Sequence, residues 1–136
     1  MKKILKKYFT LEQAERLLPK VEKGLMRLIK VNRIIALLNT VKVDYDDEFE
    51  GMCDEVQRNK ERYKASYEFY KELEILLEAG VIVKDLEEGL VDFYSSYDGR
   101  EILLCWKLGE DKIEFWHNVE DGYLERQHIS ALQRNY

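Results

Sequence analysis

The chain has 136 residues, of which 46% are apolar and 36% charged, and it carries a formal net charge of −5. This composition is too apolar for a disordered chain, and no run of about 18 apolar residues exists, so we expect no membrane-spanning segment. Two cysteines are too few for a disulfide framework or a thiolate zinc site, so we expect a reducing, cytoplasmic setting.

The length favours a single domain spanning residues 1–136, but its two halves differ in character. Residues 1–80 hold 16 basic and 15 acidic side chains, whereas residues 81–136 hold 6 basic and 12 acidic ones. We therefore expect a helical hairpin in the first half and a β-meander with a C-terminal tail in the second. The acidic second half argues against nucleic acid as a partner, because it repels phosphate backbones.

The first long helix is predicted to begin with a capping box. Thr10 and Gln13 are spaced so that each side chain satisfies a free backbone N–H at the helix start. Apolar residues then recur in steps of three and four to about Asn39, and Pro19 predicts a kink or break near Leu17–Leu18. The predicted apolar seam of this helix is Leu11, Ala14, Leu18, Val21, Leu25, Leu28, Asn32 and Ile35.

A second helix is predicted from about Asp47 to Ala79, with Gly80 as the residue that ends it. If the helices fold back antiparallel with paired residue numbers adding to 91, Asn32 meets Asn59. A buried amide pair would fix this register, because any slip leaves both amides unpaired. The predicted seam of the second helix is Phe49, Met52, Val56, Asn59, Tyr63, Ser66, Tyr70, Leu73 and Leu77.

The predicted hairpin is too long to cover its own apolar surface. The apolar residues Ile34–Leu38 cover more of the helix surface than contact with one partner helix would bury. The second half of the chain, a partner copy or both must therefore cover this surface. A basic stripe on the first helix and a mostly acidic stripe on the second are interpreted as two solvated faces or as the contact of a four-helix homodimer. The basic stripe is Arg16, Lys20, Lys23, Arg27 and Lys30, and the other is Asp54, Arg58, Glu61, Glu68 and Glu72.

Three or four antiparallel strands are predicted after residue 80, so the fold class is α+β. Val81–Val83 is a short strand, and Asp98-Gly99 is a strong signal for a two-residue hairpin turn. That turn pairs residues whose numbers add to 197, which places Asp92 opposite Cys105. Cys105 is interpreted as a buried packing residue.

A second two-residue turn is predicted at Glu110-Asp111. It would place Trp106 opposite Phe115, an aromatic cross-strand pair. Because side chains alternate between faces, this register puts His117 on the face that packs on the helices and Asp92 on the other face.

Residues suited to metal binding or catalysis are few. His117 with Glu120 and Asp121 in the following turn could hold a divalent metal, against the interpretation of His117 as a hydrogen-bonded structural residue. Arg100 and Arg126 could clamp an anionic ligand, or could pair with neighbouring carboxylates.

Motifs of one family cover nearly the whole chain. They are Tyr8–Thr10, Leu17–Pro19, Val83–Phe93, Asp98–Glu110, Phe115–His117, Gly122–Tyr123 and Arg126. Together they resemble a prokaryotic family of uncharacterised proteins catalogued as domain of unknown function 2203, although Tyr94 stands where that family often has proline. The resemblance implies a bacterial or archaeal origin and no particular activity. It marks ligand-binding candidates at strand ends and turns: Asp92, Arg100, Trp106, Glu110, Trp116, His117 and Arg126.

These observations lead to three functional hypotheses. The first is a self-associating binding or assembly module without catalytic activity, forming a homodimer. The second is a small ligand- or metal-dependent enzyme with its site near His117, Glu110, Arg100 and Arg126. The third is a nucleic-acid accessory protein that uses the basic stripe.

Overall fold

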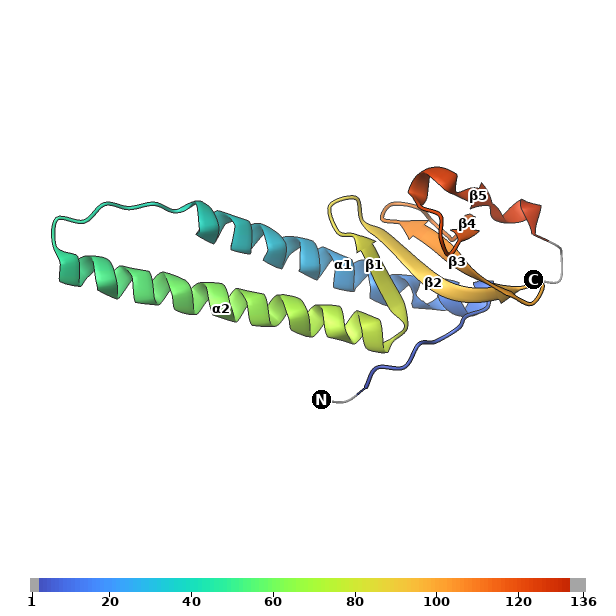
Figure 1. The fold of residues 1–136 in the computed structure, drawn as a ribbon, viewed down its shortest axis with the longest axis horizontal. Coiled ribbons are helices and arrows are strands. Elements are labelled where there is room, and N and C mark those ends of the chain that lie inside the picture. Colours follow the sequence, from blue (N-terminus) through green and yellow to red (C-terminus); the bar gives the residue numbers. More distant parts are fainter. Residues whose placement is uncertain (1–2, 133–136) are drawn as a thin grey trace.

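The computed structural model describes residues 3–132, so the ends of the predicted domain, residues 1–2 and 133–136, lie outside the described residues. The chain folds as two long helices followed by an antiparallel sheet, which is the predicted α+β class. Figure 1 shows that the sheet packs against only one end of the hairpin, and that the loop between the helices lies far from it. The elements are α1 (Leu11–Thr40), α2 (Glu48–Glu78), β1 (Val81–Asp85), β2 (Leu90–Tyr97), β3 (Arg100–Lys107), β4 (Phe115–Asn118) and β5 (Gln127–His128).

Local sequence signals set the ends of both helices. Thr10 Oγ1 accepts a hydrogen bond from the backbone of Gln13, whose side chain accepts one from the Thr10 N–H, so the predicted capping box is confirmed. Gly80 follows α2 with a φ of 96°, in the left-handed region that glycine tolerates. α1 continues through Pro19 without a break, although the proline ring leaves the Glu15 carbonyl without its usual helical donor. The predicted break is therefore wrong, and a kink at Pro19 stays a prediction.

The predicted alignment of the two helices is wrong. Gly24 packs against Leu76, and Arg62 reaches the Leu38 carbonyl, so facing residue numbers add to about 100 instead of 91. Asn32 is exposed on α1, so the predicted buried amide pair does not form.

The face of α2 that packs on α1 also differs from the predicted seam. Its buried residues are Ala65 and Leu76, whereas Tyr63 and Tyr70 are 76% and 65% exposed. A buried tyrosine needs a partner for its hydroxyl, which a seam of apolar side chains does not offer. The tyrosines therefore turn to solvent, and the smaller residues face α1.

The five strands lie in chain order, β1-β2-β3-β4-β5, one more than the three or four predicted, because the two-residue β5 pairs with β4. The β2–β3 register is confirmed, with Asp92 opposite Cys105. Asp98 and Gly99 both have positive φ, as a tight hairpin turn requires.

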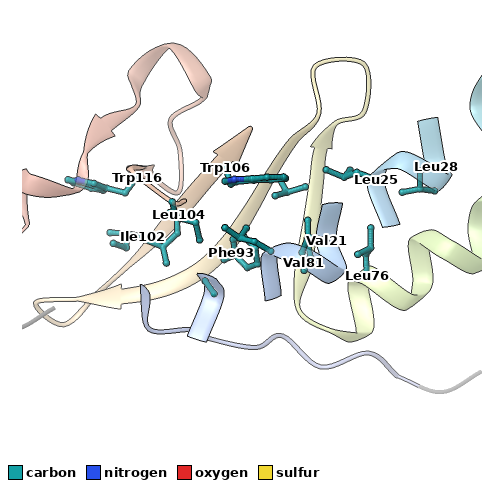
Figure 2. Packing of buried hydrophobic residues seen from close by; sticks show 14 of the residues in the cluster. Val21, Leu25, Leu28, Leu76, Val81, Phe93, Ile102, Leu104, Trp106 and Trp116 are labelled. Atoms are coloured by element: carbon teal, nitrogen blue, oxygen red, sulfur yellow. The ribbon is translucent and has the colours of Figure 1, made fainter. Parts of the chain in front are cut away.

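One face of the sheet packs on the helices and forms the core. Figure 2 shows side chains of the strands and of α1 pointing toward one another in this layer. Among the residues that the structure describes, no helix combines the length and apolar character needed to cross a membrane. The buried cluster includes Val21, Leu25, Leu28, Leu76, Val91, Phe93, Ile102, Leu104, Trp106, Ile113 and Trp116.

Candidate functional site

The register between β3 and β4 decides which side chains meet on the outer face of the sheet. Cys105 lies opposite Phe115, and Leu103 lies opposite His117. The predicted pairing of Trp106 with Phe115 is therefore wrong by one residue. A one-residue shift moves every side chain of a strand to the other face, so His117 lies on the outer face.

The reason for the shift lies in the connection between the two strands. The predicted two-residue turn is replaced by residues 108–114, in which Ile113 is fully buried in the core. The Glu110 side chain folds back, and its carboxylate accepts a hydrogen bond of 2.7 Å from the Lys107 N–H. The Glu110 carbonyl also accepts from the Trp106 indole at 2.9 Å. The connection therefore includes residues that a two-residue turn would have left in β3 and β4.

The consequence is a buried group of three polar side chains, which we call the outer-face trio: Asp92, Cys105 and His117. They come from β2, β3 and β4, and each is at most 2% exposed. His117 Nε2 lies 3.3 Å from Asp92 Oδ1, and one ligand-type atom from each residue lies within 4.8 Å of the others. The prediction that Asp92 and His117 lie on opposite faces is wrong.

The electrostatics of the trio favour a charged imidazole. Burial acts to lower the pKa of His117, but hydrogen bonds to Asp92, Cys105 and the Asn118 carbonyl, together with the Asp92 charge, outweigh it and raise the pKa to about 10. His117 Nδ1 lies 2.8 Å from the Asn118 carbonyl oxygen. Asp92 Oδ2 is buried and has no hydrogen-bond partner among the described residues.

Arg126 covers the trio on the Cys105 side. Its guanidinium makes two contacts with the Glu110 carboxylate, at 3.3 and 3.2 Å, and Nη1 lies 3.9 Å from Cys105 Sγ. The guanidinium carbon lies 4.0 Å from the centre of the Phe115 ring and 4.4 Å from that of Tyr123. The paired carboxylate and the two ring faces hold the arginine in place. Phe115 and Tyr123 were not among the predicted site residues, since nothing in their spacing points to Arg126.

The remaining candidates lie apart from the trio. Trp116 is 4% exposed in the core beneath the sheet, and its indole N–H is buried without a partner among the described residues. Arg100 is exposed, with its guanidinium 5.8 Å from the Trp116 ring centre, so it does not join Arg126. Glu120 is exposed, and Asp121 accepts a hydrogen bond from the Asn118 amide. Neither Glu120 nor Asp121 belongs to the group within 4.8 Å.

A second candidate surface lies on α2, on the side roughly opposite to α1. Its large apolar and aromatic side chains are between 57% and 76% exposed. They follow helical spacing, and most belong to the seam that the sequence predicted for the hairpin interior. We call them the outer stripe: Phe49, Met52, Val56, Tyr63, Tyr67 and Tyr70.

Comparison with known proteins identifies the family. Residues 7–129 match the family model described as "Uncharacterized conserved protein (DUF2203)", which confirms the resemblance seen in the sequence motifs. The chain belongs to this family. No curated protein and no solved structure matches it.

Proposed function

We propose that the protein is a self-assembling module, in which α2 of one copy pairs antiparallel with α2 of a second copy. The observation that carries this proposal is the outer stripe, which runs over six turns of helix from Phe49 to Tyr70 in open solvent. Exposed apolar and aromatic side chains gathered along one helix face are typical of an interaction site. Because the stripe lies away from α1, pairing would leave the hairpin intact.

The spacing of the stripe fits a helical partner with the same spacing. Val56, Tyr63 and Tyr70 follow one another at seven-residue intervals, with Tyr67 between the last two. Such a repeat keeps one seam facing a partner helix along its length. The same patch would serve both copies, as a two-fold symmetric contact requires.

The flanking residues favour an antiparallel alignment in which facing residue numbers add to about 123. In this alignment Val56 lies opposite Tyr67 of the second copy, and Lys60 lies opposite Tyr63 of the second copy. On one flank, Glu50 lies near Lys71 of the second copy, which pairs opposite charges twice across the two-fold axis. This charge complementarity supports a second copy of the chain as the occupant.

The assembly would act as a spacer with two ends. With a rise of 1.5 Å per residue, the two Ala79 positions would lie roughly 50 Å apart along the bundle. Each end would present one sheet with its outer-face trio. We place this assembly in a reducing prokaryotic cytoplasm, which the two free cysteines support.

Charge reversal tests the pairing. Wild-type protein at tens of micromolar should sediment as a dimer, while Glu50→Lys and Lys71→Glu each bring like charges together and weaken the dimer. The double variant should regain the dimer, and an equimolar mixture of the single variants should form a heterodimer. Glu22→Lys, an exposed reversal on α1, is the matched control and should leave the dimer unchanged.

Two outcomes would contradict the proposal. A wild-type chain that stays monomeric at these concentrations rules out self-assembly through the outer stripe. A dimer that persists in both single variants and in Val56→Asp, at a residue that is 57% exposed, would place the contact elsewhere.

A further inference from the structure

We propose that the outer-face trio binds one divalent metal ion of the zinc type, with the Asp92 carboxylate, the Cys105 thiolate and the His117 imidazole each supplying one ligand atom. A thiolate, an imidazole and a carboxylate are the donors that Zn²⁺ takes in proteins. This inference is independent of the proposed assembly, because the trio lies on the sheet and the outer stripe lies on α2.

The distances within the trio fit a shared ion. Ligand atoms about 2.0–2.3 Å from a tetrahedral zinc ion are roughly 3.3–3.7 Å from one another. His117 Nε2 and Asp92 Oδ1 are 3.3 Å apart, which is long for a hydrogen bond between charged groups but matches two ligands of one ion. All three ligand atoms lie within 4.8 Å of one another, so small rotations of the side chains would bring all three within bonding distance of one ion.

The surroundings of the trio have the features of a metal site. His117 Nδ1 lies 2.8 Å from the Asn118 carbonyl oxygen, a contact that leaves Nε2 as the ligand atom and fixes the ring orientation. Asp92 Oδ2 is buried without a hydrogen-bond partner among residues 3–132, and a bound cation would offset the cost of burying that oxygen. Because the three ligands project from adjacent strands of one sheet, they are held in place before the ion arrives.

Arg126 does not oppose a cation at this position. Its charge is matched by Glu110 through contacts of 3.3 and 3.2 Å, so the pair adds little net charge next to Cys105. Three protein ligands are typical of sites that keep a fourth position for water or another small ligand. The enclosure of the trio, with every member at most 2% exposed, favours a bare ion over an organic substrate.

Cobalt provides the decisive measurement, because a thiolate bound to Co²⁺ absorbs in the near ultraviolet. Metal-stripped protein, kept reduced, is titrated with Co²⁺. We expect one equivalent per chain, a thiolate charge-transfer band, and visible bands of tetrahedral intensity that Zn²⁺ abolishes. The Cys53→Ser variant should retain the whole spectrum. Since Cys53 is exposed and Cys105 would then be the single thiol, this variant assigns the sulfur ligand even if Cys105→Ser fails to fold.

Ligand variants supply the second measurement. Competition with a chromophoric chelator should show that Asp92→Asn, Cys105→Ser and His117→Gln each weaken Zn²⁺ binding at least about tenfold. His128→Gln, at an exposed histidine, should not change the affinity. The proposal is overturned if Cys53→Ser protein shows no thiolate band with Co²⁺, or if the folded ligand variants bind Zn²⁺ as tightly as wild type.

Discussion

Arg62 of α2 donates a hydrogen bond of 3.2 Å to the carbonyl oxygen of Leu38, in the last turn of α1. The last four carbonyls of a helix lack donors within the helix, and α1 has no basic residue of its own in that turn. The guanidinium therefore supplies a donor and a positive charge at the C-terminal end of α1. A second bond of 2.6 Å to the Asn59 side chain orients it.

Replacing Arg62 with methionine should destabilise the hairpin. Methionine keeps most of the aliphatic length but removes both donors, and the loss of such charge-assisted bonds costs about 1.5–3 kcal/mol. Urea denaturation should show a free energy of unfolding reduced by about that amount. Arg33→Met, at an exposed position of α1, is the control. Equal losses in the two variants would contradict a specific role for Arg62.

The hairpin itself could be predicted from sequence, but its alignment could not. The capping box and the glycine at residue 80 are local signals, so the helix ends were correct. The alignment depends on which face of α2 is buried. The prediction placed the largest apolar and aromatic side chains of α2 on that face, but most of them are exposed. Leu76 packs against Gly24, and Arg62 donates a hydrogen bond to α1. Neither glycine nor arginine is apolar enough to be recognised in a repeat of apolar residues, so the sequence did not indicate these contacts.

The contact between Gly24 and Leu76 leads to a second prediction. Alanine is favoured over glycine inside a helix by about 1 kcal/mol. A Cβ at residue 24 would lie 3.0–3.2 Å from three atoms of the buried Leu76 side chain, which is closer than ordinary van der Waals contact. We therefore expect Gly24→Ala to lower the free energy of unfolding by about 1 kcal/mol. In a Leu76→Val background the same change should cost less or stabilise. If Gly24→Ala instead raised the free energy of unfolding of the otherwise wild-type protein, the prediction would be wrong, and Leu76 would be able to move aside at little cost.

Two glycines of the sheet separate backbone strain from steric clash. Gly89 and Gly99 have φ values of 68° and 76°, so alanine costs roughly 1–2 kcal/mol of strain at either position. At Gly89 the added Cβ would also lie 2.7 Å from Leu108 Cβ, whereas at Gly99 nothing lies within 4 Å. Chemical denaturation should show a larger loss for Gly89→Ala, by at least about 1 kcal/mol. Similar losses in both variants would mean that the Leu108 loop moves freely.

Two members of the outer-face trio could be placed together from the sequence, and the third could not. The Asp98-Gly99 turn allows one register, so Asp92 beside Cys105 was predictable. The position of His117 depends on a seven-residue connection that is closed by a side chain, Glu110, folding back on the backbone. Alternation of residues cannot reveal such a loop, and an error of one residue there removes His117 from the site.

The last prediction concerns the pH dependence of stability in metal-free protein. Burial acts to lower the pKa of His117, but its contacts with Asp92, Cys105 and the Asn118 carbonyl outweigh burial and raise the pKa from the ordinary 6.5 to about 10. The cation nearest to this group is Arg126, which lies beyond Cys105 and is paired with Glu110. A group whose pKa is higher in the folded than in the unfolded protein stabilises the folded state. Its stabilising effect is complete at pH values below the pKa of the group in the unfolded protein. This contribution is therefore complete below about pH 6.5 and is lost as the pH rises toward 10.

The comparison of wild type with His117→Gln reports on the imidazole and the side chains in contact with it, because groups that do not contact His117 titrate equally in both proteins. In the presence of a chelator, the difference between their free energies of unfolding should be largest near pH 6 and should shrink steadily up to pH 10, by on the order of a few kcal/mol. Asp92→Asn should flatten the same dependence, since it removes the carboxylate that holds the proton. A difference that stays constant across this range would mean that His117 is neutral in the folded protein, and that its contact with Asp92 is an ordinary hydrogen bond.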